Sequence, residues 1–415
     1  GRVQPPDGNH LEESGGDGGM KSNKIRLGEQ CVVTSSKRFH LSERITQGVP
    51  FYCSKEIIKK FNGEDVTECD YISEDLYKKV SNEFGVPKEN DLLITTRGTI
   101  GIPYLYKRTD RFYFADGNLT WIKDFDSNLY SKFLYYWFQS YEGRKKFEAL
   151  AKGTAQKAVP ISGIKTLEIE LPSLKDQKRI VDILSAYDDL IENNQKQIKL
   201  LEEAAQRLYK EWFVDLRFPG HENTKIVDGV PEGWNEKTLS QVANVIMGQS
   251  PKSEFYNSEK KGLPFHQGVG SYGVRFVMDD IYSTSYTRIA EPNSILFSVR
   301  APVGRLNITK NKVVIGRGLA AINQADGCQS YLYYLLKNRF FKDNIVGNGS
   351  IFASVSKDEL LNQKFLIPER NLMMQFEKIV SQMDKQIENL DSKNKKLIEA
   401  RDRLLPKLMS GEVEV

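Results

Sequence analysis

The chain has 415 residues, of which 40% are hydrophobic and 27% are charged, and its formal net charge is +4. This length accommodates two or three domains of ordinary size. The apolar runs are too short to cross a bilayer, since a membrane helix needs about 20 consecutive apolar residues. The mild positive charge permits a nucleic-acid partner but does not by itself indicate one.

Residues 1–19 are rich in Gly and acidic side chains, show no periodicity and end just before Met20. We interpret them as an added leader that takes no part in the fold. No signal peptide is recognisable, so we expect a cytoplasmic protein. The four cysteines form no CxxC pair and lie at no zinc-finger spacing from the four histidines, which predicts reduced thiols and no metal site.

The next elements predict two similar domains of class α+β, each followed by a long helix. Short β-branched and aromatic runs such as LLITT (92–96) and ILFSV (295–299) are typical of strands. Aromatic-rich helices are expected over 131–151 and 329–346. The predicted order is a first domain, a helical spacer, a linker, a second domain, a second helical spacer and a tail, over 20–170, 171–213, 214–233, 234–366, 367–410 and 411–415.

The two helical spacers are copies of one sequence. At an offset of 196 residues they align without a gap and share 13 identical positions in 43, including Pro172 with Pro368. The match extends upstream, where DLLITTRGTIG (91–101) resembles SILFSVRAPVG (294–304) and pairs Arg97 with Arg300. The chain is therefore two copies of one unit.

Each spacer carries the apolar seam of a coiled coil, with seam residues spaced alternately by four and three from Ile180 to Trp212 and from Phe376 to Leu408. Each seam contains one interior Asn, and Asn194 and Asn394 occupy different slots. Parallel pairing would bury each amide against an aliphatic chain, at a cost of about 1–3 kcal/mol. Antiparallel pairing brings the two amides together, so we predict an antiparallel coiled coil. The alternative is that each Asn lies at the edge of the seam and contacts water.

The antiparallel register also places Tyr187 opposite Arg401, where ring and guanidinium can stack. Pro406 is expected to disturb the last turn of the second helix. A helix of about 39 residues is nearly 60 Å long, at about 1.5 Å per residue. Such a pair would hold the domains at its two ends about a pseudo-twofold axis, an arrangement suited to two separated half-sites on duplex DNA.

These motifs together resemble those of the specificity subunits of type I restriction–modification systems. The resemblance covers nearly the whole chain after Met20 and rests on LPSLKDQKRIVDILSAYDDLIE, RLYKEWFVDLRFPG followed by GVPEGW, RDRLLPKLMSGEVEV, DLLITTRGTIG and KGTAQKAVPISGIKTLEIELP. It implies two target-recognition domains, each reading one half of a bipartite, asymmetric DNA sequence. It also implies that the helices set the spacing and dock two methyltransferase subunits, which motor-nuclease subunits join.

The resemblance implies no cofactor in this chain, with S-adenosylmethionine, Mg and ATP expected in partner subunits only. The residues agree with a chain that is not an enzyme. The only Pro-Pro pair, Pro5-Pro6, lies in the leader, and no Gly-Lys dipeptide is present, so the Pro-Pro-aromatic loop of an amino-methyltransferase and a P-loop are both missing. Two other readings stay open: a stand-alone DNA enzyme, and a structural coiled-coil scaffold with two protein-binding domains.

DNA contacts are expected from Lys and Arg on phosphates and from side chains that reach base edges. The candidates in the first domain are Lys37, Arg38, Arg97, Lys152, Gln156 and Lys157. Those in the second domain are Gln267, Tyr272, Arg300, Arg317, Asn348 and Ser350. The second-domain loop GNGSIFASVS lacks the Gln-Lys of GTAQK. For Arg97 the alternative is a structural ion pair or a cap on a turn.

Overall fold

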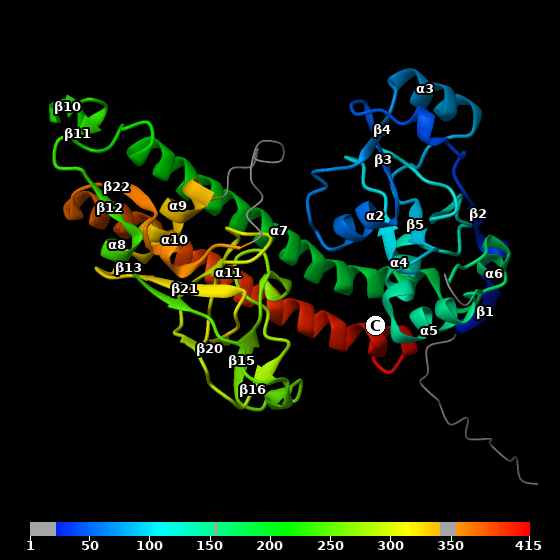
Figure 1. Cartoon of the computed structure of the whole chain (residues 1–415). Coiled ribbons are helices and arrows are strands. Elements are labelled where there is room, and N and C mark those ends of the chain that lie inside the picture. Colours follow the sequence, from blue (N-terminus) through cyan, green and yellow to red (C-terminus); the bar gives the residue numbers. More distant parts are fainter. Residues whose placement is uncertain (1–21, 154–156, 341–353) are drawn as a thin grey trace, which may run out of the picture. The chain divides into compact units, whose positions relative to one another are not determined.

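The computed structural model describes residues 22–153, 157–340 and 354–415 (Figure 1). The chain divides into two units: unit 1 comprises residues up to Asn194 together with Ser392–Val415, and unit 2 comprises Gln195–Asp391. Each unit contains one α+β domain and one part of each long helix, α7 (Leu174–Phe213) and α11 (Arg370–Ser410). The predicted fold class is therefore confirmed. Within the described ranges no helix is long and apolar enough to cross a membrane.

The main sheet of unit 1 is a four-stranded antiparallel sheet in the order β2-β8-β5-β6. Its central strands are apolar on both faces, and all four residues of β5 are buried. Such near-continuous apolar runs are typical of strands covered on both sides. The strands are β2 (Val32–Thr34), β8 (Leu119–Lys123), β5 (Leu92–Thr95) and β6 (Pro103–Leu105).

A smaller sheet in unit 1 has the order β4-β3-β7, with β3 antiparallel to β4 and parallel to β7. The chain between its strands forms two helices, and Ser73 caps the second by accepting a hydrogen bond from the amide of Leu76 at 3.2 Å. These elements are β3 (Val49–Tyr52), α2 (Ser54–Phe61), β4 (Asp70–Ile72), α3 (Glu74–Glu83) and β7 (Tyr113–Phe114).

In unit 1, two helices pack in one apolar cluster with the main sheet and the long helices, and a two-stranded antiparallel ribbon completes the domain. The turn between α4 and α5 is tight: a Cβ at Gly143 would lie 1.9 Å from the carbonyl oxygen of Trp137, so only glycine fits. The elements are β1 (Ser22–Arg26), α1 (Leu27–Gln30), α4 (Ser131–Gln139), α5 (Tyr141–Ala149), α6 (Ile161–Lys165) and β9 (Glu168–Pro172), with β1 antiparallel to β9.

Unit 2 repeats this topology. Its main sheet has the order β13-β21-β18-β19, its second sheet the order β14-β16-β15-β20-β17, and β12 pairs with β22 as β1 does with β9. The strands of the first sheet are β13 (Ala243–Met247), β18 (Ile295–Ser298), β19 (Leu306–Ile308) and β21 (Leu319–Gln324). Those of the second are β14 (Tyr256–Asn257), β15 (Leu263–His266), β16 (Tyr282–Ser283), β17 (Ile289–Ala290) and β20 (Val313–Ile315). The remaining elements are β10 (Ile226–Val227), β11 (Val230–Pro231), β12 (Asn235–Thr238), α8 (Leu239–Val242), α9 (Gln329–Phe340), α10 (Lys357–Leu361) and β22 (Lys364–Ile367).

Strand register makes the repeat exact enough to assign equivalent positions. Leu92 pairs with Ile122 in unit 1 as Ile295 pairs with Ile322 in unit 2. The parallel pairs correspond as well, since β3 lies beside β7 as β15 lies beside β20. The equivalence of Arg97 with Arg300, inferred from sequence, is therefore also an equivalence of position in the sheet.

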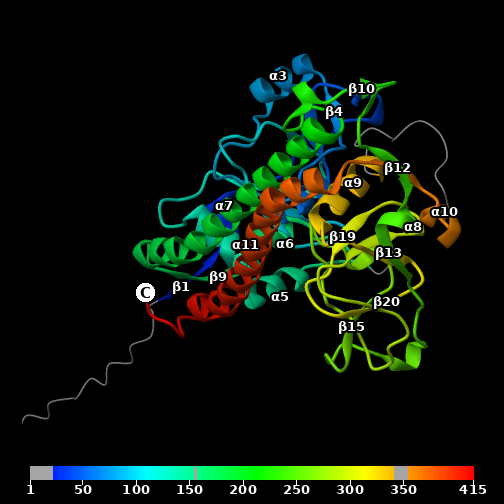
Figure 2. The same cartoon turned by 90° about the vertical axis from the view of Figure 1, so that its left-hand side faces the viewer.

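The long helices lie side by side and antiparallel in each unit (Figures 1 and 2). In unit 1, Ile180 and Leu184 of α7 share one apolar cluster with Leu405 and Leu408 of α11. In unit 2, the C-terminal end of α7 meets the start of α11, where the ring of Trp212 lies 6.0 Å from that of Phe376. The antiparallel pairing predicted from the seams is confirmed.

The two seam asparagines meet inside unit 1. Asn194 donates from Nδ2 to Oδ1 of Asn394 at 2.8 Å, and Asn394 donates to the carbonyl of Ile191 at 3.4 Å. Both residues are buried, so they do not lie at a hydrated edge of the seam. For Arg401 the sequence pointed to the ring of Tyr187, whereas the structure gives its guanidinium the carboxylates of Asp188 (2.6 Å) and Asp402 (2.8 Å). The two carboxylates accept charge-assisted hydrogen bonds from the guanidinium, whereas the face of the Tyr187 ring has no oxygen to accept them.

The helix α11 continues through Pro406 to Ser410, so the expected disturbance does not end it. Proline at this position lies within the last turn and removes one backbone donor there. Buried Leu405 and Leu408 flank Pro406 and hold this turn against the apolar cluster of unit 1.

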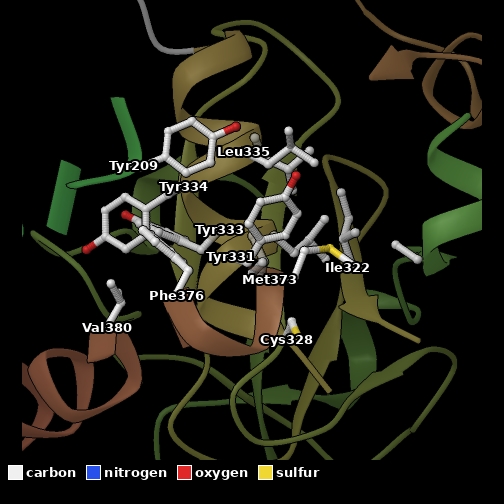
Figure 3. Close-up of a cluster of buried hydrophobic side chains, with 14 of the residues drawn as sticks. Tyr209, Ile322, Cys328, Tyr331, Tyr333, Tyr334, Leu335, Met373, Phe376 and Val380 are labelled. Atoms are coloured by element: carbon white, nitrogen blue, oxygen red, sulfur yellow. The ribbon is translucent and has the colours of Figure 1, made fainter. Parts of the chain in front are cut away.

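The core of unit 2 is aromatic, and Figure 3 shows its centre. Tyr209 of α7 and Phe376 of α11 meet edge to face with ring centroids 6.0 Å apart, and Tyr331 and Tyr334 of α9 lie within 6.3 Å of Phe376. The helix α9 therefore joins the second domain to both long helices. The aromatic residues of this helix serve the core rather than a surface for stacking bases.

Candidate nucleic-acid interface

In both units the central strands of the main sheet end in a turn that carries an arginine. In unit 1, β5 ends at Thr95, whose Oγ1 accepts a hydrogen bond from the amide of Ile102 at 2.9 Å. This bond closes the turn that holds Arg97 at its tip. Gly98 follows with φ +75°, a conformation that glycine adopts without strain. The side chain of Arg97 is exposed.

A second segment brings two lysines to the same edge. Lys152 and Ala158 form an antiparallel bridge, with the amide of Lys152 donating to the carbonyl of Ala158 at 2.8 Å. Ala158 also bridges Arg97. Lys157 adjoins this bridge and is exposed, so Arg97, Lys152 and Lys157, three candidates for DNA contact, lie at one edge of unit 1. Gln156 lies outside the described residues.

This edge of unit 1 is hollowed. Arg97 and Lys152 line a surface hollow of about 320 Å³ together with Ser35, Thr96, Gly117 and the apolar residues Val159–Ile161. A concave surface lined by two cations suits a nucleic-acid strand.

Lys37 and Arg38 lie at a neighbouring hollow of about 350 Å³, which shares Ser35 with the first. The amide of Lys37 donates to the hydroxyl of Tyr113 at 2.8 Å, and its ammonium lies 4.7 Å from the centre of the Phe84 ring. Arg38 donates to Asp116 at 2.9 Å. Four of the five predicted cations of the first domain thus line two adjoining hollows, and Lys157 lies one residue from Ala158 in the lining of the first.

In unit 2 the equivalent edge carries Arg300. It forms an antiparallel bridge with Ser354, and the amide of Val355 donates to the carbonyl of Val299 at 2.8 Å, as the amide of Val159 donates to that of Thr96 in unit 1. The two units therefore present the same backbone frame with an arginine at the same point.

Gln267 and Arg317 join this edge through Ser250. Its hydroxyl donates to Oε1 of Gln267 at 2.7 Å and accepts from the amide of Arg317 at 3.2 Å. The glycines on either side of Arg317 allow this approach, because a Cβ at Gly316 would lie 2.7 Å from the Gln267 side chain. The amide of Val299 donates to the carbonyl of Gly318 at 2.9 Å, which brings the Arg317 loop beside Arg300.

Tyr272 is placed differently from the other candidates. It packs on the apolar cluster of the second sheet, and its hydroxyl donates to the carbonyl of Leu296 at 2.9 Å. Burial raises the pKa of this phenol. We therefore leave Tyr272 out of the interface. Asn348 and Ser350 lie outside the described residues.

Sequence reasoning missed the residues that complete these edges from other strands. Ser35, Lys123 and Ser250 line the two edges, yet they come from segments with no repeat signal. A search for polar residues one to three positions beyond β2 and β13 would have found Ser35 and Ser250. Sequence reasoning also missed Arg275, which is buried in unit 2 and binds Asp384 at 2.5 Å and Glu202 at 3.3 Å.

No group of three or more His, Cys, Asp or Glu side chains that could hold a metal ion occurs among residues 22–153, 157–340 and 354–415. Burial raises the pKa of the Cys31 thiol to about 12 and that of Cys328 to about 11. Thiols of this kind stay protonated at neutral pH and are poor nucleophiles.

Comparison with known proteins decides the family. A family model, the type I restriction modification DNA specificity domain, matches residues 21–203 and again residues 231–400. The chain belongs to the family of type I restriction–modification specificity subunits. The double match follows the internal repeat, with each copy covering one α+β domain and most of the helix that follows it.

Two relatives of this specificity-subunit family come from Methanocaldococcus jannaschii. The type I restriction enzyme MjaX specificity subunit is 30% identical over 328 residues, which cover 78% of this chain and 77% of the relative. The MjaIX specificity subunit is 28% identical over 301 residues and 69% of each chain. The crystal structure of the type I restriction–modification S subunit from M. genitalium shares the fold, with a TM-score of 0.58, 20% identity and coverage of 94% of this chain and 96% of that one.

Proposed function

We propose that this specificity subunit reads a bipartite, asymmetric DNA sequence, with the edge around Arg97 on one half-site and the edge around Arg300 on the other. The observation that carries the proposal is the repeated frame: both arginines end the same strand of the main sheet and bridge an equivalent segment, at Ala158 and Ser354. Arginine is the side chain most often used to read guanine and to bind phosphate.

The surroundings of the two arginines support an asymmetric target. In unit 1 Arg97 has Lys152 as a neighbour in the same hollow. In unit 2 Arg317 lies in the loop beside Arg300, and Gln267, which follows β15, joins it through Ser250. A side-chain amide such as that of Gln267 can donate to and accept from a base edge. Two edges with the same frame and different side chains are suited to two different half-sites.

Catalysis is proposed to lie in partner subunits. A member of the specificity-subunit family is not itself catalytic, and methyltransferase subunits docked on α7 and α11, joined by motor-nuclease subunits, would supply the chemistry. S-adenosylmethionine, Mg and ATP would bind those partners. Exposed apolar side chains along the long helices, including Leu190, Leu200 and Met374, support a docking role.

The test is a map of methylated adenines in cells that express the chain with its methyltransferase subunits. The wild type is expected to give one bipartite motif. Arg97→Ala should relax one half of the motif and Arg300→Ala the other, each costing about 1–3 kcal/mol in binding to that half. Arg144→Ala is the matched control, because Arg144 is exposed on α5 and lines neither hollow.

Three results would contradict the proposal. Methylation by the isolated chain would make it an enzyme. A complex that forms but shows no sequence-dependent DNA binding would favour the scaffold. If Arg97→Ala and Arg300→Ala both relaxed the same half of the motif, the two edges would not read two different half-sites.

A further inference from the structure

The hollow beside Lys37 has two buried hydroxyls in its wall. Ser35 Oγ and Ser36 Oγ are inaccessible to solvent and, among the residues that the structure describes, have no hydrogen-bond partner. Buried hydroxyls are nearly always paired, because an unpaired one has lost its water without a replacement. Two adjacent hydroxyls whose donors are unused among the described residues therefore lie beside this hollow.

Three cations line the same hollow: Lys37, Arg38 and Lys123. The two ammonium groups lie over aromatic rings, Lys37 at 4.7 Å from the centre of Phe84 and Lys123 at 4.4 Å from that of Trp121. A cation over a ring face keeps its hydrogens available for a second partner. These interactions hold the ammonium groups at the hollow without using their capacity to bind an anion.

Two carboxylates balance part of this charge. Asp116 accepts from Arg38 at 2.9 Å, and Asp124 lies 3.6 Å from Lys123. Neither carboxylate lines the hollow. The lining therefore offers the ammonium groups of Lys37 and Lys123 and the guanidinium of Arg38 to an anion, and neither carboxylate lines it. The hydroxyls of Ser35 and Ser36 lie beneath the surface and reach an anion there after a side-chain rotation. That donor set fits an anion with several oxygens.

We propose that this hollow is a phosphate clamp that holds one phosphodiester of the DNA backbone beside the half-site read by unit 1. The assignment rests on the proposed function and adds a ligand class and a position to it. Ser35 lines both this hollow and the one that holds Arg97. The clamp thus fixes the backbone immediately beside the residues that face the bases.

The clamp belongs to unit 1 alone. Strand register places Met247, Gly248, Gln249 and Ser250 of unit 2 where unit 1 has Ser35, Ser36, Lys37 and Arg38, and Asn323 where it has Lys123. None of these five is charged. The repeated frame carries the arginine edge in both units, whereas the clamp is an addition in the first.

The first experiment measures the salt dependence of DNA binding by the full chain in complex with its methyltransferase subunits. Removing one cation that neutralises a phosphate lowers the slope of log K against log salt by about 0.9. Lys37→Gln and Lys123→Gln are each expected to lower the slope by about one. Lys145→Gln, an exposed lysine of α5 outside the hollow, is the control and should leave it unchanged. Equal slopes in all three variants and the wild type would overturn the clamp.

The second experiment separates the clamp from a structural role. Ser35→Ala and Ser36→Ala remove unpaired hydroxyls, so the melting temperature should hold or rise. Binding to DNA should nevertheless weaken by about tenfold, with the salt slope unchanged, because a neutral donor to a charged oxygen is removed. Variants that bind as well as the wild type would refute the role of the hydroxyls.

The third experiment identifies the source of the phosphate. In a duplex carrying the mapped site, single methylphosphonate linkages are scanned along the half-site of unit 1. One or two linkages should weaken binding by the wild type and have no further effect on Lys123→Gln. Inorganic phosphate alone should not raise the melting temperature of the wild type; if it does so and the Lys37→Gln variant does not respond, the hollow is a site for free phosphate and the backbone assignment is wrong. Absence of any sequence-specific binding by the wild type would instead defeat the proposed function itself.

Discussion

The helices α4 and α9 each receive a polar side chain from a long helix at their N-terminal end, an amide in unit 1 and a carboxylate in unit 2. In unit 1 the buried amide of Gln177 accepts from the backbone amide of Tyr130 at 2.8 Å and so caps α4. In unit 2 the carboxylate of Glu377 does the same for α9, accepting from the amides of Ser330 at 3.2 Å and Tyr331 at 3.0 Å. Burial raises the pKa of Glu377, partly offset by these two bonds. The neutral and the charged cap should therefore respond differently to pH.

We expect Glu377→Gln to remove a pH dependence from the stability of unit 2. A carboxyl whose folded pKa is raised contributes stability below its unfolded pKa, near 4.5, and loses it as pH rises through the folded value. The Gln variant keeps one of the two acceptor oxygens and does not titrate, so its free energy of unfolding should depend less on pH above 4.5. Urea denaturation at several pH values measures this, and an unchanged pH profile would contradict the assignment.

The substitution Gln177→Glu in unit 1 should lower the free energy of unfolding at neutral pH. Gln177 also donates from Nε2 to the carbonyls of Asn128 at 2.8 Å and Pro172 at 2.9 Å. A carboxylate would face these two oxygens without a proton to donate, in a fully buried position. We expect a loss of about 2 kcal/mol or more at neutral pH, recovered in part on acidification. Stability equal to that of the wild type at neutral pH would contradict this prediction and show that the site rearranges around the carboxylate.

At the scale of elements, each domain is fastened to the long helices by an aspartate that recurs in the repeat. Asp188 accepts from the hydroxyl of Tyr136 on α4 and binds Arg401 of α11. Asp384 lies 3.5 Å from the hydroxyl of Tyr334 on α9 and binds Arg275. The aspartates were visible as an identical pair in the sequence. The cations were not, because unit 2 has Ala205 in the slot of Arg401 and takes its arginine from the domain.

The difference in burial predicts different costs for these two arginines. Arg275 is 2% exposed, and its removal leaves Asp384 and Glu202 without their cation. We expect Arg275→Ala to destabilise unit 2 by about 3–5 kcal/mol. Arg401 is half-buried, so Arg401→Ala should cost about 1 kcal/mol or less beyond its packing. Hydrogen exchange of α9 and α4 in the two variants measures the loss locally, and equal protection in both would contradict this ranking.

For the whole molecule, the sequence predicted what repeats and failed where the copies differ. Periodicity and the offset of 196 residues were enough for two α+β domains, two long helices and the antiparallel register, because these depend on apolar spacing and on the two seam amides. They also placed Arg97 and Arg300 on one frame. Ser35, Lys123 and Arg275 escaped because their roles depend on strand register and on neighbours far apart in sequence, which no local pattern encodes.

The seam amides lead to a prediction about the complete chain. Asn194→Leu alone should strand the amide of Asn394 in the seam and destabilise unit 1 by about 1–3 kcal/mol. The double variant Asn194→Leu with Asn394→Leu leaves no amide unpaired and should recover most of this loss. Urea denaturation of both variants provides the comparison, and equal stability of single and double variants would refute the pairing.

The same residue should act with the opposite sign when α7 pairs with a copy of itself. In a fragment of residues 20–213 the seam of α7 has no α11 to pair with, and a second copy of α7 in the same antiparallel register would place Asn194 against Ile198, because Ile198 occupies the slot of Asn394. Each amide would then be buried against an aliphatic chain. We expect this fragment to self-associate weakly and Asn194→Leu to strengthen its dimer by about tenfold or more, measured by sedimentation. One substitution that weakens the full chain and strengthens the fragment would show that the two asparagines select pairing of α7 with α11 over pairing of like helices; a dimer weakened by Asn194→Leu would mean that the fragment uses another register.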